Sequence, residues 1–253
     1  MKANDILESS IGMRLIRSRT RRTAKTHNEL AHSTVIAGAS YSPWLSDEKF
    51  RRVYDVAKKY TLVDVFRCYE LYVLASQLQD IEGDVLEVGV WRGGTAAAIR
   101  LGLMESPAPR EFFIADTFKG VVKASDKDSR YVGGEHADTD VSIVESLFKN
   151  LDLPLPTILQ GIFPDDHPDA VKGKIAFLHC DVDVYESTKD IIDWALPRLS
   201  RNAIIVFDDY GFPTCEGVTN YCNELRKTTD MTFMHNLNGH AIFINNGKSA
   251  QNE

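Results

Sequence analysis

The stretch DVLEVGVWRGGTAAAIRLGLME, residues 84–105, combines a continuous apolar run, a turn with two adjacent glycines and a helical segment. A continuous apolar run, in contrast to an alternating one, predicts a strand that is covered on both faces, as in a parallel sheet. A turn and a helix directly after such a strand form the unit from which doubly wound α/β domains are built. The stretch therefore predicts this fold class for the chain around it.

The chain after this stretch repeats the same arrangement. Four further apolar runs follow, each with turn signals near its ends: EFFIADTF (111–118), PTILQGIF (156–163), KIAFLHCDVDV (174–184) and AIIVFDDY (203–210). Helical stretches over 141–151, 186–199 and 216–227 separate most of them. Repeated strand and helix units of this length predict an α/β doubly wound sheet.

Two further patterns lie outside these units. Residues 57–78 carry apolar side chains at helical spacing and predict one amphipathic helix. Residues 231–245, MTFMHNLNGHAIFIN, predict two strands joined by a turn that contains Asn-Gly, and therefore an antiparallel hairpin at the sheet edge. No internal repeat or low-complexity linker interrupts the chain, so we expect one domain over residues 57–253 and an N-terminal helical extension or arm over residues 1–56.

The composition is that of an ordinary globular protein. Of the 253 residues, 43% are hydrophobic and 26% are charged, which argues against a disordered or fibrous chain. The net charge of −7 argues against a nucleic-acid backbone as the main partner. Residues 1–30 hold seven basic and three acidic side chains, a net charge of +4, so the rest of the chain carries −11. The excess acid therefore lies in the body of the chain.

Several features argue against export and against a membrane partner. No apolar run approaches the roughly 18 residues of a transmembrane helix, and no apolar segment of a signal peptide follows the arginine-rich start. The four cysteines show no CxxC spacing, which fits free thiols in a reducing compartment. We expect a cytoplasmic protein. The basic start is most simply a solvated, partly helical arm, with oligomer packing or an anionic partner as alternatives.

The ends of the first two apolar runs predict a small-molecule site. In open α/β sheets, ligands bind beyond the carboxyl ends of the strands. Glu87, Gly89, Gly93 and Gly94 follow the first run, where glycines let a backbone approach a ligand. The spacing is not that of a dinucleotide fingerprint, so a plain tight turn is the alternative. Asp116 ends the second run and is able to accept both hydroxyl hydrogens of a ribose, or else to cap a helix.

The ends of the fourth and fifth runs predict a metal site. Asp181 and Asp183 end the fourth run, and Asp208 and Asp209 end the fifth. Neighbouring parallel strands bring these carboxylates close together, where a divalent cation relieves their repulsion. Ligation by carboxylate oxygens alone favours a hard cation such as Mg²⁺. Either acidic pair by itself is more often a solvated loop or a helix cap.

The segment VVKASDKDSRYVGGEHADTD, residues 121–140, is long, polar and poor in aliphatic side chains. A segment of this size between two elements is commonly a mobile lid or a binding loop. Disorder without function is the alternative. If the segment covers the crevice, it excludes water and selects the acceptor.

Four motifs in one order carry a resemblance to a known family. They are EVGVWRGG (87–94), ADTFKG (115–120), DVDVYEST (181–188) and FDDYG (207–211). Over roughly residues 57–243 the chain resembles the macrocin O-methyltransferases, metal-dependent S-adenosylmethionine enzymes that methylate sugar hydroxyls of antibiotics. The resemblance implies the class I methyltransferase fold, a Rossmann-like seven-stranded sheet of order 3-2-1-4-5-7-6 with strand seven antiparallel.

The resemblance also implies the site residues and the partners. It implies that four regions bind the cofactor. The glycine loop after strand one contributes Glu87, Gly89, Arg92, Gly93 and Gly94, and the turn after strand two contributes Asp116, Thr117 and Phe118. The pair Thr61 and Leu62 precedes strand one, and Gln160 and Gly161 follow strand three. It implies Asp181, Asp208 and Asp209 as ligands of Mg²⁺ or another hard divalent cation, and Asp183 as the general base, with Asp181 beside it in the catalytic pair. The expected partner is a glycosylated small-molecule acceptor, and the expected assembly is a homo-oligomer, a dimer or larger.

Two other classes of function stay open at the level of sequence. A nucleotide-sugar glycosyltransferase also uses an Asp-x-Asp motif to hold Mg²⁺ against a diphosphate, but it gives no reason for the glycine loop and Asp116. A non-catalytic α/β binding protein predicts no metal dependence. Binding of S-adenosylmethionine, of a uridine-diphosphate sugar or of NAD separates these classes.

Overall fold

The computed structural model describes residues 21–22, 30–32, 39–106 and 108–247. The chain divides into two units, Met1–Ser40 and Tyr41–Glu253. In the described part of the first unit, the strands β1 (Arg21–Arg22) and β2 (Ala31–His32) pair antiparallel. The rest of the predicted arm up to residue 38 lies outside the described residues. The second unit begins before the boundary at residues 56 and 57 that the sequence predicts.

The second unit contains a seven-stranded sheet that confirms the predicted α/β doubly wound fold. Its strands are β3 (Asp84–Val88), β4 (Phe112–Asp116), β5 (Thr157–Gln160), β6 (Ile175–Cys180), β7 (Leu199–Phe207), β8 (Thr232–His235) and β9 (Ala241–Ile244). They lie in the order β5-β4-β3-β6-β7-β9-β8, and β9 is antiparallel to both of its neighbours. The order and the antiparallel strand agree with the expected class I methyltransferase sheet, and the predicted edge hairpin is confirmed.

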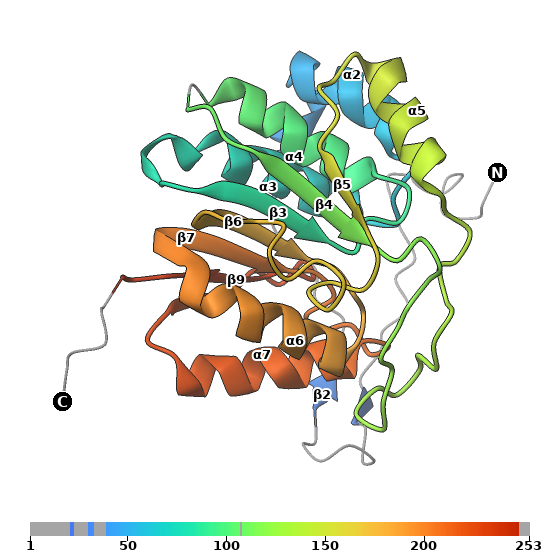
Figure 1. Cartoon of the computed structure of the whole chain (residues 1–253), viewed down its shortest axis with the longest axis vertical. Helices are drawn as coiled ribbons and strands as arrows, with labels where there is room; N and C mark the ends of the chain where they lie inside the picture. The colour runs from blue at the N-terminus through green and yellow to red at the C-terminus, as the bar shows by residue number, and fades with distance from the viewer. Residues whose placement is uncertain (1–20, 23–29, 33–38, 107, 248–253) are drawn as a thin grey trace. The chain divides into compact units, whose positions relative to one another are not determined.

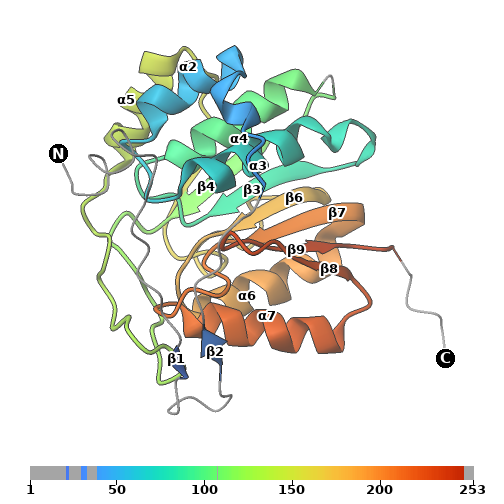
Figure 2. The same cartoon turned by 180° about the vertical axis from the view of Figure 1, so that it is seen from behind.

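Helices cover both faces of this sheet (Figures 1 and 2). The helices are α2 (Glu48–Ala57), α3 (Val65–Ser76), α4 (Gly94–Glu105), α5 (Val141–Leu151), α6 (Tyr185–Ala195) and α7 (Glu216–Thr228), and the short 3-10 helices are η1 (Pro43–Leu45), η2 (Leu78–Asp80) and η3 (Leu196–Arg198). The first four α-helices lie on one face and α6 and α7 on the other. This arrangement explains why the strand sequences are apolar without alternation.

Each face of the sheet has its own apolar core. Val85 packs into the core under α2 to α5, and the next residue, Leu86, packs into the core under α6 and α7. This alternation follows from the pleat, which points successive side chains to opposite faces. All residues of β6 are buried, so the central strand is covered on both sides.

The predicted single helix over residues 57–78 is wrong. The helix α2 ends at Ala57, and α3 begins at Val65. Asp64 caps the new helix, because its carboxylate accepts hydrogen bonds from the backbone N–H groups of Phe66 and Arg67, at 2.9 and 3.0 Å. The apolar spacing continues across the break and therefore hides it. The break leaves residues 58–64 as a connection beside the carboxyl ends of the strands.

The parallel strands bring their carboxyl ends to one edge. In the register of the sheet, Val88 pairs with Cys180, and Cys180 pairs with Phe207, so the residues that follow the three strands are neighbours. At this edge Gly89 has a φ of +85°, and a Cβ on it would lie 1.6 Å from the backbone oxygen of Asp181. Only glycine allows this close approach of the two strand ends.

Candidate functional site

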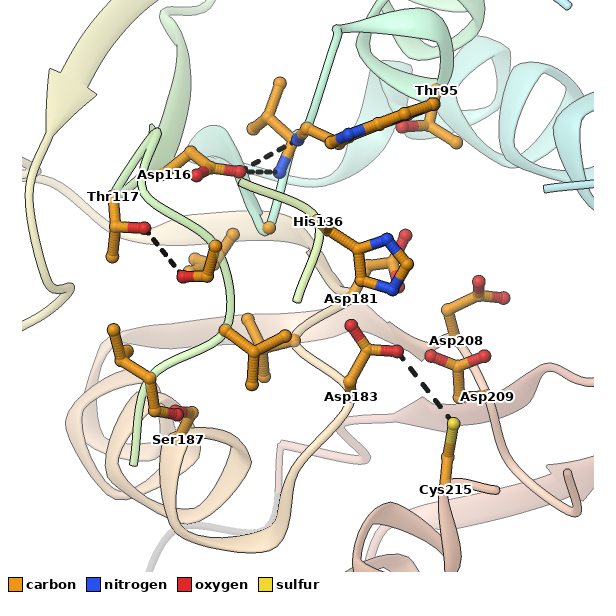
Figure 3. A pocket seen from close by; sticks show the side chains of 18 of the residues that line it. Thr95, Asp116, Thr117, His136, Asp181, Asp183, Ser187, Asp208, Asp209 and Cys215 are labelled. Carbon is orange, nitrogen blue, oxygen red and sulfur yellow. Dashed lines mark hydrogen bonds between the residues drawn. The ribbon is translucent and has the colours of Figure 1, made fainter. Parts of the chain in front are cut away.

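A cavity of about 310 Å³ lies beyond the carboxyl ends of β3, β4, β6 and β7. Figure 3 shows the acidic side chains that project into it and the turn around Asp116 on its opposite side. The cavity walls contain many of the residues predicted for the cofactor and the metal: Thr61, Leu62, Gly89, Asp116, Thr117, Gly161, Asp181, Asp183, Asp208 and Asp209. The structure thus brings together residues that lie far apart in the sequence.

The other predicted cofactor residues do not line this cavity: Glu87, Arg92, Gly93, Gly94, Phe118 and Gln160. Glu87 is fully buried, and its Oε1 lies 2.8 Å from Nδ1 of His179. The Arg92 guanidinium points to Asp138 instead, at 2.7 Å, and stacks over the Trp91 ring. Gly94 begins α4 and donates its N–H to the carbonyl of Tyr60. Contact of these residues with the cofactor stays a prediction.

Asp116 holds the loop that follows β3. Its Oδ2 accepts hydrogen bonds from the backbone N–H groups of Val90 and Trp91, at 2.7 and 2.8 Å, and its Oδ1 accepts one from Phe118, at 2.7 Å. A carboxylate has about four acceptor positions, so Oδ1 retains capacity for a ligand hydroxyl. Binding of ribose by Asp116 remains a prediction.

Three carboxylates form an acidic cluster in the cavity. Asp181 follows β6, Asp208 and Asp209 follow β7, and one oxygen of each lies within 4.8 Å of the others. Burial raises the pKa of Asp181 and of Asp209 well above the usual range, and repulsion from the neighbouring carboxylates raises both further. Without a cation, these two groups are therefore difficult to ionise. The oxygen donors and the close spacing fit a hard divalent cation.

Asp208 differs from the other two carboxylates because it has cationic partners. Arg67 Nη1 lies 2.5 Å from its Oδ1, and His240 Nε2 lies 3.1 Å from the same oxygen. Burial alone would raise its pKa, but His240 and Arg67 outweigh burial and hold the pKa well below the usual range. Burial would likewise lower the pKa of His240, but Asp208 and Glu70 outweigh it and raise the pKa. Asp208 is thus ionised before any cation binds.

Asp183 and Asp209 have unusual backbone conformations. Their φ angles are +64° and +63°, in the left-handed region that residues other than glycine adopt only at a cost of about 1–3 kcal/mol.

The thiol of Cys215 lies beside Asp183 and Asp209 (Figure 3), and its Sγ is 3.9 Å from Asp183 Oδ1. Burial and the charges of Asp209 and Asp183 raise the pKa of the Cys215 thiol, so this cysteine stays protonated and is a poor nucleophile.

The segment 121–140 forms part of the cavity wall. Its residues Tyr131 and His136 line the cavity, together with Val121 and Val122. Ion pairs attach the segment to the sheet domain at both ends: Lys123 with Asp165 and Asp190, Lys127 with Glu186, and Asp138 with Arg92. Burial raises the pKa of Tyr131, and the nearby charge of Asp183 raises it further. The position of the segment fits the predicted binding loop.

Sequence reasoning missed the basic residues of the site. Arg67 lies within α3, in a sequence that reads as an amphipathic helix, and His240 follows the hairpin turn 236–239. No motif marks either residue. A charged residue among the apolar positions of a helix is the one signal for Arg67, whose side chain is 7% exposed.

The chain has clear similarity to proteins of one family. The macrocin O-methyltransferase (TylF) family profile matches residues 46–244. Among curated proteins, mycinamicin III 3''-O-methyltransferase of Micromonospora griseorubida is 33% identical over 178 residues, which cover 64% of this chain and 70% of that protein. A tetracenomycin-C-derivative 4'-O-methyltransferase of Streptomyces olivaceus is 32% identical, over 62% of this chain and 64% of that protein. The chain thus matches about two thirds of the length of these relatives.

Solved structures support the fold. The O-methyltransferase NovP superposes with a TM-score of 0.64 at 24% identity, over 74% of this chain and 82% of that protein. The calicheamicin methyltransferase CalS11 gives a TM-score of 0.61 at 18% identity, over 83% and 99% of the two chains. Within the described residues, no helix has the length and apolar character needed to cross a membrane. The chain has the class I methyltransferase fold, is an O-methyltransferase and belongs to the macrocin O-methyltransferase family.

Proposed function

We propose that the protein transfers the methyl group of S-adenosylmethionine to a sugar hydroxyl of a glycosylated natural product, in a reaction that depends on Mg²⁺. The observation that carries this proposal is the position of the acidic cluster, Asp181, Asp208 and Asp209, in the same cavity as the glycine loop after β3. Two relatives bear the names of O-methyltransferases for mycinamicin III and for a rhamnosyl-tetracenomycin C. A sugar hydroxyl is therefore the acceptor that we favour.

The proposed cofactor site lies between the ends of β3 and β4. Gly89, Asp116 and Gly161 line this part of the cavity, with Thr61 and Leu62 from the connection before α3. Gly161 has a φ of +148°, and a Cβ on it would lie 2.6 Å from Oδ2 of Asp166, so a side chain there would be strained and would displace the Asp166 carboxylate. These residues leave room for the nucleoside, and Asp116 Oδ1 retains capacity for one ribose hydroxyl.

The proposed metal ligands are Asp181, Asp208 and Asp209. The cluster fits a divalent cation because two of its carboxyl groups have raised pKa values that a positive charge reverses. When bound, Mg²⁺ supplies positive charge that orients the sugar hydroxyls and lowers their pKa. The three carboxylates would hold that charge in the cavity, at the ends of two neighbouring strands.

Asp183 is the proposed general base. It lies within the same cavity, on the strand end that also carries Asp181. The acceptor oxygen forms a bond to the methyl carbon while the bond from this carbon to the sulfonium sulfur breaks, and the hydroxyl proton passes to the Asp183 carboxylate. The products are the methyl ether and S-adenosylhomocysteine. Walls formed by segment 121–140 keep water from the reacting atoms.

Family membership decides against the two alternatives that the sequence leaves open. A nucleotide-sugar glycosyltransferase and a non-catalytic binding protein both disagree with a match to O-methyltransferases over residues 46–244. The glycine loop and Asp116, which a glycosyltransferase leaves unexplained, have a place in the cavity of the methyltransferase fold.

The test of the proposed function measures cofactor binding and turnover separately. Asp208→Ala and Asp209→Asn should abolish methylation of glycosylated macrolide and aminocoumarin acceptors, followed by mass spectrometry, while calorimetry shows retained S-adenosylmethionine binding. Asp209→Asn is included because Asp208→Ala removes one of the two carboxylate partners of the buried Arg67. Full activity in excess EDTA, or turnover retained in both variants, would contradict the metal dependence.

We also propose a cytoplasmic location and a homo-oligomeric assembly. The four cysteines, Cys68, Cys180, Cys215 and Cys222, are buried free thiols, which supports a reducing compartment such as the cytoplasm. A homo-oligomer is proposed from the family resemblance, and light scattering coupled to size-exclusion chromatography tests it.

A further inference from the structure

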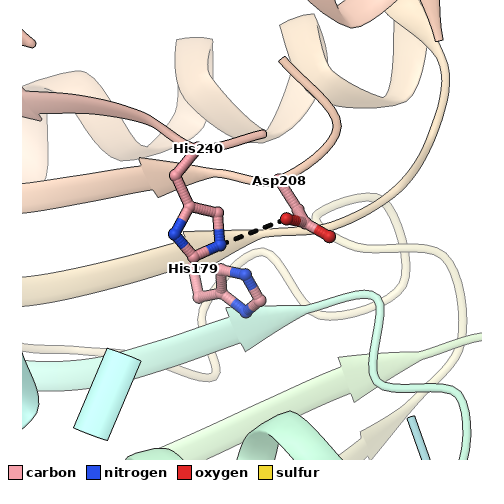
Figure 4. A group of neighbouring side chains, drawn as sticks. All are labelled: His179, Asp208 and His240. Carbon is pink, nitrogen blue, oxygen red and sulfur yellow. Dashed lines mark ion pairs between the residues drawn. The ribbon is translucent and has the colours of Figure 1, made fainter. Parts of the chain in front are cut away.

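Buried charged side chains surround Asp208: Arg67 lines the cavity beside it, and His240 lies behind it, outside the cavity lining. Arg67 Nη1 and His240 Nε2 both lie at ion-pairing distance from Oδ1 of Asp208, at 2.5 and 3.1 Å (Figure 4 shows the histidine side). The exposed fractions of the three side chains are 7%, 0% and 3% for Arg67, His240 and Asp208. Both cationic groups use the same oxygen. In the described residues, Oδ2 of Asp208 takes no part in these ion pairs.

Both cationic partners are themselves held by carboxylates. His240 Nδ1 lies 2.5 Å from Oε2 of Glu70, and Arg67 Nε lies 3.0 Å from Oδ2 of Asp64. The other oxygen of Glu70 accepts a hydrogen bond from the side-chain amide of Asn236. A carboxylate behind each partner fixes the orientation of the imidazole ring and of the guanidinium plane.

The neighbouring His179 does not complete a second metal site. One ligand atom from each of His179, Asp208 and His240 lies within 4.8 Å of the others (Figure 4), which is a spacing that a metal ion permits. The guanidinium of Arg67, however, already lies 2.5 Å from the Asp208 oxygen that faces His240. A further cation at this oxygen would meet that positive charge at short range in a buried environment, where charges repel strongly. The cluster is therefore better explained as support for Asp208.

We propose that Arg67 and His240, with Glu70 behind His240, are positioning residues that fix Oδ1 of Asp208 and so direct Oδ2 toward the divalent cation. The inference rests on the metal dependence proposed above. A carboxylate that is already fixed loses little rotational freedom when it binds an ion. Asp181 and Asp209 have no such cationic pair in the described residues, so Asp208 is the ligand around which the site is organised.

Calorimetric titration of the full-length chain with Mn²⁺, which replaces Mg²⁺ at carboxylate sites, tests this inference. Glu70→Ala and His240→Asn should each weaken Mn²⁺ binding about 10-fold, as expected for the loss of a group that orients a ligand. Glu70→Gln should stay closer to the wild type because its amide oxygen still accepts the Nδ1–H of His240. The matched control is Glu105→Ala, which removes an exposed ion pair with Lys49 and should leave the affinity unchanged.

Steady-state kinetics distinguish a role of Glu70 in positioning Asp208 from a role in stabilising the fold. In Glu70→Ala, the Mg²⁺ concentration that gives half-maximal rate should rise about 10-fold, while the rate at saturating Mg²⁺ recovers. A purely structural role would lower the melting temperature and leave this concentration unchanged. Glu70 is 20% exposed, so its variants retain a folded chain more readily than changes at fully buried His240.

The outcomes distinguish this inference from the function on which it rests. Wild-type Mn²⁺ affinity in folded Glu70→Ala and His240→Asn overturns the positioning role alone. Two bound ions per chain, with one lost in His179→Asn, also overturn it, because the cluster would then be a second metal site. A wild-type chain that binds no Mn²⁺ contradicts the metal dependence itself, and the positioning role falls with it.

Discussion

Single backbone positions determine the geometry of the site. Gly89 allows the ends of β3 and β6 to touch, and Asp183 and Asp209 adopt left-handed backbone conformations where the chain turns out of β6 and β7. Strained backbone at functional residues persists only where the surrounding structure enforces it. The buried ends of β6 and β7 provide that enforcement.

Gly89→Ala should destabilise the fold by about 3 kcal/mol or more, because its Cβ would overlap the Asp181 carbonyl and the residue has a positive φ. Urea denaturation measures the change in the free energy of unfolding. Gly134→Ala is the matched control, since Gly134 has nearly the same φ, +86°, with nothing within 4 Å of an added Cβ. Equal losses in the two variants would show that strain, and not the contact of the strand ends, is responsible.

Asp183→Asn should lower kcat about 100- to 10,000-fold, because the amide cannot take the proton of the acceptor hydroxyl. The KM for S-adenosylmethionine should change little, since Asp183 lies on the acidic side of the cavity. Steady-state kinetics measure both quantities. Asp193→Asn removes an exposed partner of Lys189 on α6 and is the control. A kcat near that of the control would assign the proton transfer to another group.

The sequence alone predicts the acidic residues of the site, but it does not predict the basic residues that contact them. The carboxylates Asp181, Asp208 and Asp209 follow apolar strands directly, so parallel pairing brings them together without further information. Arg67 and His240 reach Asp208 from a helix and from the turn before β9, and no local pattern specifies that contact. Arg92 pairs with Asp138 in this structure, and its predicted contact with the cofactor stays a prediction.

At the scale of elements, the break between α2 and α3 matters most for the cavity. Asp64 caps α3 and also pairs with Arg67, so the residue that begins the helix also orients a partner of Asp208. The periodicity of residues 57–78 could not reveal where α3 begins, since Val63 of the connection is buried in the same core as α3. The predicted helix therefore extended α3 toward the N-terminus through a connection that includes Thr61 and Leu62 and lines the site.

The packing of these two helices should make stability sensitive to alkali. Burial raises the pKa of Tyr54 on α2 and of Tyr72 on α3 to about 12, from an ordinary value of 10. In the unfolded chain these tyrosines lose their protons near pH 10, whereas in the folded chain they keep them up to about pH 12. Their contribution to the stability of the folded chain is therefore complete below pH 10 and is lost as the pH rises from 10 to 12. The melting temperature should therefore fall across this window, and circular dichroism follows it.

The double variant Tyr54→Phe, Tyr72→Phe should show a shallower fall over the same window. Tyr41→Phe is the control, because Tyr41 is 83% exposed and its change should leave the pH dependence as in the wild type. A double variant with the wild-type profile would assign the alkaline loss to other groups.

At the scale of the whole molecule, the strand order and the topology could be predicted because each strand is a distinct apolar run and the family resemblance supplies their order. The second unit, Tyr41–Glu253, holds every cavity residue, and it begins earlier in the chain than the sequence indicated. The elements η1 and α2 belong to this unit although they precede the predicted start of the domain at residue 57, which stays a prediction.

Mg²⁺ at millimolar concentration should raise the melting temperature, and EDTA should lower it again. The cation binds the folded chain, where it relieves the repulsion among three clustered carboxylates. It does not stabilise the unfolded chain in this way, because the carboxylates are not clustered there. Differential scanning fluorimetry measures the shift. Asp181→Asn should reduce the shift, whereas Asp193→Asn, far from the cluster on α6, should preserve it. An equal shift in both variants would place the stabilising cation elsewhere.

The position of β9 sets the order in which the site forms during synthesis. This strand is the last described in the chain, yet it lies between β7 and β8, and His240 immediately precedes it. A chain emerging from the ribosome therefore contains all four acidic residues before it contains the strand that pairs with β7. Asp208 gains His240 as its second partner only after the hairpin of β8 and β9 has been synthesised. The charge balance of the carboxylate cluster therefore depends on a segment that follows all four acidic residues in the chain.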